Sequence, residues 1–217
     1  MSSDTSERGQ TITCLFQPFE RVAGGLALVL GAVAIVLSAA LASSAGLIHD
    51  GVLDLHFSAH LSFWTLLAQG LINWLSLSGL LLVAGSCLAP RSFRWIDLLG
   101  TQALARWPML AATAYLSIPG LNTRIRELTE ELMSKMPTDP SKVMASSAYL
   151  LDAMWLTLIS LPSLVFIAWM IWLMYHAYSI STDMKGSRAV FSFVAALVLA
   201  SIFSKVLIIH LVGSPLA

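Results

Sequence analysis

Long runs of apolar residues alternate with short polar connections along the whole chain. Five of these runs contain few or no charged residues: 22–47, 61–88, 105–121, 147–178 and 189–212. A spanning helix needs about 20 mostly apolar residues, because the hydrocarbon core of a bilayer is about 30 Å thick. The pattern therefore predicts an all-α fold, a polytopic membrane helical bundle with five transmembrane helices.

The same pattern divides the chain into a short tail and one membrane domain. Residues 1–21 are mostly polar and end in a lead-in with Phe16, Pro18 and Phe19, which we expect at the membrane interface. A cleavable signal peptide would have a shorter apolar core nearer the start. We therefore interpret 22–47 as an uncleaved first span and 22–217 as a single five-helix transmembrane domain.

Composition and charge support a membrane protein and give it an orientation. Hydrophobic residues make up 57% of the chain and charged residues 11%, too apolar for a soluble domain. Lys and Arg total 12, as do Asp and Glu, so no basic excess points to nucleic acid. Basic residues mark cytoplasmic connections. They predict a cytoplasmic N-terminus and a periplasmic or external C-terminus, from Arg8 and Arg21 in the tail, Arg91, Arg94 and Arg106 in the second connection, and Lys185 and Arg188 in the fourth.

The third connection is predicted to hold a short external amphipathic helix over 122–136. Its apolar residues are three or four positions apart and share one face: Ile125, Leu128, Leu132, Met133 and Met136. Pro137 and Pro140 follow it and would end it. Such a helix can pack on its own bundle, lie in the headgroup plane or dock a partner, and the sequence leaves these three alternatives open.

Small residues recur every four positions in the first span, at Ala34, Ser38, Ala42 and Gly46. This spacing places them on one helix face, where a neighbouring backbone can approach closely. We interpret them as a helix-packing face, either within the bundle or against an oligomer partner.

Two ionisable residues, Asp152 and Lys205, lie inside predicted spans at a similar depth. Charged side chains within a membrane pair with one another or mark a transport path. They form a candidate intramembrane ion pair and, with Gln69 and Asn73, support one possible function, a small secondary transporter or channel. The alternative is a structural pair, or two side chains that reach the headgroups.

The first external connection contains His49, His56 and His60 beside Asp50 and Asp54. His56 and His60 have the spacing of helical metal ligands, but a metal site needs a third or fourth convergent ligand. We expect no metal and no cofactor. No metalloprotease, nucleophile-elbow or phosphate-loop motif occurs in the sequence, so we expect no enzymatic activity.

Residues 97–108 are the most distinctive segment. Gln102 and Arg106 are four positions apart and share a helix face, and Pro108 removes a backbone donor beside them. If the helix begins at Trp95, Arg106 lies well inside the bilayer. If it begins near Ala105, Arg106 lies in the inner headgroups. In either position this polar face could meet a cytoplasmic partner or a lipid phosphate.

The lead-in Leu15-Phe16-Gln17-Pro18-Phe19, the five spans and the segment Asp-Leu-Leu-Gly-Thr-Gln-Ala-Leu-Ala-Arg-Trp-Pro at 97–108 together resemble bacterial members of the Yip1 membrane-protein family. Asp97 to Thr101 match in part the Asp-Leu-Tyr-Gly-Pro stretch of eukaryotic members, with Leu99 and Thr101 in place of Tyr and Pro. The resemblance implies an inner-membrane protein that acts without catalysis, as an accessory or scaffolding subunit of a transport or export assembly. It implies other membrane proteins as partners, such as an ABC-type transporter, or self-association. The candidate interaction face is Asp97, Gly100, Gln102, Arg106 and Pro108.

Overall fold

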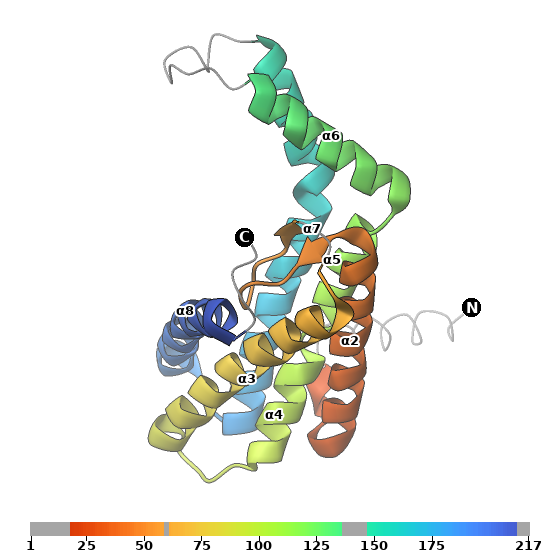
Figure 1. Ribbon diagram of the computed structural model, residues 1–217. Coiled ribbons are helices and arrows are strands. Elements are labelled where there is room, and N and C mark those ends of the chain that lie inside the picture. Colours follow the sequence, from red (N-terminus) through yellow and green to blue (C-terminus); the bar gives the residue numbers. More distant parts are fainter. Residues whose placement is uncertain (1–17, 59–60, 136–146, 212–217) are drawn as a thin grey trace, which may run out of the picture.

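The computed structural model describes residues 18–58, 61–135 and 147–211, and helices dominate these ranges (Figure 1). The elements are η1 (Pro18–Glu20), α2 (Gly24–Ala45), β1 (Leu47–Ile48), β2 (His56–Phe57), α3 (Phe63–Leu88), α4 (Trp95–Leu104), α5 (Trp107–Leu116), α6 (Pro119–Lys135), α7 (Ser147–Thr182) and α8 (Gly186–Leu211). In the described residues, four helices are long and apolar enough to cross a membrane: α2, α3, α7 and α8. They correspond to four of the five predicted spans.

The third predicted span is not a single helix from residue 105, and this part of the prediction is wrong. The chain is already helical from Trp95, breaks at Ala105 and Arg106, and continues as α5. Pro108 contributes to the break because it has no N–H for a carbonyl of the preceding turn. The polar residues that resembled a connection face inward instead. For example, the side-chain amide of Gln102 donates a hydrogen bond to the backbone oxygen of Met174 in α7 (2.8 Å).

Close packing of α2 against α4 forms one side of the bundle. A Cβ atom on Gly100 would overlap the backbone oxygen of Gly24, and one on Gly31 would overlap Ala103, so only glycine fits at either position. On the predicted helix-packing face, Ala34, Ser38 and Ala42 are buried. The fourth residue of that face, Gly46, ends α2 with a φ of 64° and a backbone N–H bonded to the Ala42 carbonyl.

Two apolar clusters form the core. One contains Leu81 of α3, Leu98 of α4, Met174 of α7 and Phe193 of α8. It also includes Phe19 from the predicted interfacial lead-in, which is therefore buried in the bundle; residues 1–17 of the tail lie outside the described residues. The second cluster joins α2, β1, α3, α5 and α6 through Ala42, Leu47, Leu66, Leu116 and Ile125.

Outside these clusters, large apolar side chains along the spanning helices point away from the bundle. Examples are Leu26 on α2 and Phe191 on α8, which are 61% and 74% exposed. A soluble protein could not carry so many, but lipid solvates them without cost. The outward surface thus fits a multi-pass membrane protein.

The connection between α2 and α3 folds back as a small antiparallel hairpin, which the apolar pattern gave no reason to expect. β1 pairs with β2 through Leu47 with Phe57 and Ile48 with His56. Two residues are too short for period-two alternation, so no strand signal exists in the sequence. The hairpin closes one end of the bundle beside α5 (Figure 1).

The predicted amphipathic helix is present as α6, which begins earlier than expected, at Pro119. Proline is favoured in the first turn of a helix because its missing N–H would be unpaired there anyway. Ile125 and Leu128 are buried, and α6 packs along the first turns of α7. The two helices form a hairpin that extends away from the rest of the bundle (Figure 1). The predicted end at Met136 lies outside the described residues.

Candidate functional site

A buried polar site surrounds Arg106, the residue at the break between α4 and α5. Its side chain is only 6% exposed, and its Nε and Nη2 atoms have no hydrogen-bond partner. Arg106 takes part in none of the ion pairs among the described residues. Of the two positions that the sequence left open, the structure supports the one inside the bundle, because the helix begins at Trp95.

The α2–α3 connection inserts His49 into the bundle beside this arginine. The backbone N–H of His49 donates to Gln69 Oε1 (3.3 Å), and Asn73 Nδ2 donates to the His49 backbone oxygen (2.7 Å). Gln69 and Asn73 are four positions apart on α3 and present one polar face to the connection. Because both backbone groups are bonded, the connection is held in a fixed position against α3.

The ring of His49 is neutral and has a defined tautomer. Burial, and after it the charges of Arg106 and His56, lower its pKa from 6.5 to about 4. His49 Nε2 lies 3.3 Å from the hydroxyl oxygen of Thr113. That hydroxyl already donates to the Met109 carbonyl (2.8 Å), so it accepts from His49. Nε2 therefore carries the proton, and only one permanent cation, Arg106, lies at this site.

Arg106, His49 and Asn73 border a small cavity of about 30 Å³. The cavity lies where the two apolar clusters meet, since Leu66 belongs to one and Met109 to the other. Small residues leave the space, namely Ala34, Ser38, Ala39, Gly51 and Gly70. Besides the arginine nitrogens, Asn73 Oδ1 has no hydrogen-bond partner. Two cationic donors and one amide acceptor are thus buried without a partner on residues that line a mostly apolar cavity.

The candidate interaction face at 97–108 is interior, which corrects the expectation that it meets a cytoplasmic partner. Gly100, Gln102, Arg106 and Pro108 are all buried. Asp97 is partly exposed and lies 3.9 Å from Arg94, a weak pair at the rim of α4. The face packs inward because its small and polar members match α2 and α7, so these residues assemble the bundle rather than a docking surface.

The candidate ion pair of Asp152 and Lys205 does not form. Asp152 pairs with Lys135 at the end of α6 (2.6 Å), and Lys205 pairs with Asp54 in the α2–α3 connection (2.5 Å). Each charged residue has an oppositely charged partner that approaches from outside the spanning helices. The geometry therefore gives no support to a transporter that uses Asp152 with Lys205.

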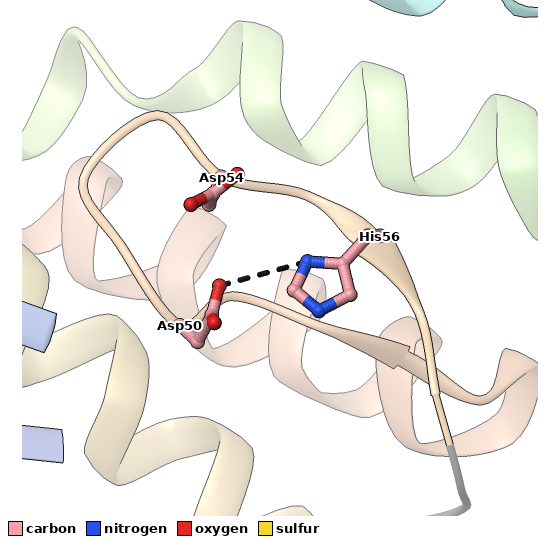
Figure 2. Close-up of side chains that lie close together, drawn as sticks. All are labelled: Asp50, Asp54 and His56. Atoms are coloured by element: carbon pink, nitrogen blue, oxygen red, sulfur yellow. Dashed lines mark ion pairs between the residues drawn. The ribbon is translucent and has the colours of Figure 1, made fainter. Parts of the chain in front are cut away.

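The histidine cluster is also rearranged. Figure 2 shows Asp50, Asp54 and His56 facing one another in the α2–α3 connection, and their ligand atoms lie within 4.8 Å of one another. His56 Nδ1 is 3.6 Å from Asp50 Oδ1, while the ammonium group of Lys205 forms an ion pair with the carboxylate of Asp54. His49 points into the bundle instead, and His60 lies outside the described residues. Two acids and one imidazole are a possible donor set for a divalent cation, but the lysine already neutralises part of it.

The sequence indicates Arg106, His49, Gln69 and Asn73 only as separate residues, and the fold brings them together. The four-residue spacing of Gln69 and Asn73 on one apolar helix was an available signal. Thr113 had none, because a threonine among apolar residues is common in spanning helices.

Comparison with known proteins adds no assignment to this geometry. No protein-family model, no curated protein and no solved structure matches the chain. The resemblance to the Yip1 family therefore stays a prediction.

Proposed function

We propose that the chain is a five-pass inner-membrane protein that acts without catalysis, as an accessory or scaffolding subunit of a larger membrane assembly. The observation that carries the proposal is the α6–α7 hairpin, which extends past the bundle and presents an apolar stripe. The Yip1 resemblance adds a transport or export assembly, such as an ABC-type exporter, as the class of partner.

Contacts at both ends of α2 support the five-pass arrangement. Near one end, Gly100 of α4 lies against Gly24. At the other end, the side-chain amide of Asn122, in the first turn of α6, donates to the Ala45 carbonyl (3.0 Å). The broken helix α4–α5 thus follows α2 along its whole length and in the same direction. A broken helix is tolerated at membrane depth where protein surrounds the break.

The α6–α7 hairpin extends beyond the level at which the other helices end. The hydroxyl of Tyr115, in the last turn of α5, donates to the Ile159 carbonyl (2.8 Å), so Ile159 is level with that end. Residues 159–182 of α7 rise about 36 Å, enough to cross the hydrocarbon core. Residues 147–158 continue for about 18 Å more.

Four apolar residues form a stripe on this extension, at the spacing of one helix face. Leu151, Met154, Trp155 and Leu158 are 54%, 55%, 51% and 56% exposed. The opposite face is occupied by α6, as the pair of Lys135 with Asp152 shows. An apolar surface beyond the hydrocarbon region is typical of a protein contact. We expect another membrane protein to cover it.

Photocrosslinking in native membranes tests this function. A benzophenone amino acid replaces Trp155 in one variant and Glu127 in a matched control, where the side chain is 54% exposed on the polar face of α6. We expect a discrete adduct with another membrane protein from position 155 and none from position 127. Mass spectrometry identifies the partner.

A second pair of variants shows whether the contact is specific. Leu151→Glu with Leu158→Glu should lower the adduct yield by at least about tenfold, as loss of a central apolar contact does. The matched control is Glu130→Gln with Glu131→Gln. Crosslinking at position 155 to lipid alone would contradict the proposal. An adduct between two copies of this chain would show that the stripe serves self-association, and the accessory role would be abandoned.

A further inference from the structure

We propose that the cavity beside Arg106 binds one small inorganic anion, a halide such as chloride, as a buried counter-ion. The proposal is independent of the partner suggested above. It rests on a guanidinium group that the fold buries, leaves without an acceptor and places beside this cavity.

Arg106 has the charge but no partner. Its guanidinium stays protonated at neutral pH, and the side chain is 6% exposed. Nε and Nη2 are both without a hydrogen-bond acceptor. An isolated buried cation is strongly unfavourable, whereas one with a counter-ion and filled donors is tolerated. The two nitrogens lie on one edge of the group and can donate to the same ligand.

The polar and sulfur-containing side chains that line the cavity with Arg106 do not compensate its charge. They come from α2 (Ser38), the α2–α3 connection (His49), α3 (Asn73) and α5 (Met109). None is a carboxylate, and His49 is a neutral imidazole. The uncompensated charge of Arg106 therefore favours a negative ion beside it.

The size of the cavity restricts the ligand. A volume of about 30 Å³ by this measure corresponds to roughly two water positions, because one water needs about 10–15 Å³. A single halide with one water fits this volume. Larger, polyatomic anions exceed it.

Thermal unfolding of the full-length protein in detergent tests the proposal. Sodium gluconate is replaced stepwise by sodium chloride or bromide at constant ionic strength. A ligand that binds only the folded state raises the midpoint by mass action. We expect a saturable rise of roughly 5–10 °C at a hundredfold excess over the dissociation constant.

Arg106→Gln should abolish the halide dependence. Arg94→Gln, a matched loss of an arginine that is 79% exposed, should keep it. If Arg106→Gln does not fold, bromide anomalous scattering from crystals of the unaltered protein decides the matter. A bromide peak beside Arg106 supports the site. Equal midpoints in gluconate and halide, or a cavity that holds only water, would overturn it.

Discussion

At the scale of single residues, His49 combines near-complete burial with hydrogen bonds from its backbone and its ring. Its backbone groups bond to Gln69 and Asn73, and its ring donates to Thr113. None of these bonds requires a charge on the ring, and burial and the charge of Arg106 disfavour a second cation. The fold therefore depends on this imidazole staying uncharged.

This requirement predicts loss of stability in acid. The pKa of His49 is about 4 in the folded protein and 6.5 in the unfolded chain. Between these values the unfolded chain binds one more proton, so the free energy of unfolding falls as the pH falls from 6.5 to 4. The loss from this group is on the order of 3 kcal/mol. Thermal midpoints measured across this pH range should fall accordingly.

His49→Gln separates this residue from other titrating groups. Glutamine keeps the backbone bonds and can still donate to Thr113, but it does not titrate. We expect the variant to be less stable at pH 7 and to have a shallower pH dependence between 6.5 and 4. A dependence as steep as that of the unaltered protein would show that His49 is not the responsible group.

The residues of the buried site were visible in the sequence, but their assembly was not. Arg106 was recognised as unusual, and Gln69 and Asn73 as polar residues within a span. His49 was grouped with His56 because they are near in sequence, whereas the hairpin of β1 and β2 turns their side chains to different environments. Convergence depends on how a loop folds back, and no local pattern encodes that.

At the scale of elements, the contact between α2 and α4 depends on glycine. The backbones approach closely enough that a methyl group on Gly100 would overlap the Gly24 carbonyl oxygen. We predict that Gly100→Ala destabilises the bundle by about 1–3 kcal/mol, the usual cost of overpacking. The measurement is the unfolding midpoint of the purified protein.

Gly79 on α3 provides the matched control. It is helical too, but a Cβ atom there would have no neighbour within 4 Å. Gly79→Ala should be neutral or slightly stabilising, because alanine favours the helix. Equal effects of the two substitutions would show that helix propensity, and not the close approach of α2 and α4, determines the result.

The apolar pattern predicted the four long helices closely because lipid-facing and core-facing residues are both apolar in a membrane bundle. The same pattern missed α4 because polar residues of this helix face the interior of the bundle. Its residues Asp97, Thr101 and Gln102 look like a connection, yet Thr101 and Gln102 donate hydrogen bonds to backbone carbonyls within the bundle, as in the bond of Thr101 to the Asp97 carbonyl (2.7 Å). A hydropathy pattern counts polar residues but does not register the hydrogen bonds that they form inside the bundle.

At the scale of the whole molecule, different connecting segments lie at the two ends of the bundle. Arg91, before α4, lies 3.9 Å from Asp183, after α7, so these two connections share one end. α6 lies at the other end, where Asn122 and Arg126 donate to carbonyls at the end of α2. The five-pass arrangement predicts that residues 92 and 127 face opposite sides of the membrane.

Cysteine labelling checks this prediction. Ser92→Cys and Glu127→Cys are placed in a chain with Cys14→Ser and Cys87→Ser. An impermeant maleimide added to spheroplasts should modify position 127 at once and position 92 only after permeabilisation. Ser187→Cys, in the first turn of α8, should behave like position 92. Equal reactivity of positions 92 and 127 would mean that α4–α5 does not cross.

The broken helix has a consequence for how the protein is made. Arg106 separates two helices of ten residues each, and an arginine at the centre of a span costs about 2.5–3.5 kcal/mol during translocon insertion. In the five-pass arrangement that we propose, this pass is the least able to partition into lipid by itself. α2 leaves the ribosome first and carries the complementary surface, with Gly31 against Ala103. α2 thus serves as an intramembrane template, and the third pass enters the bilayer by assembling on it.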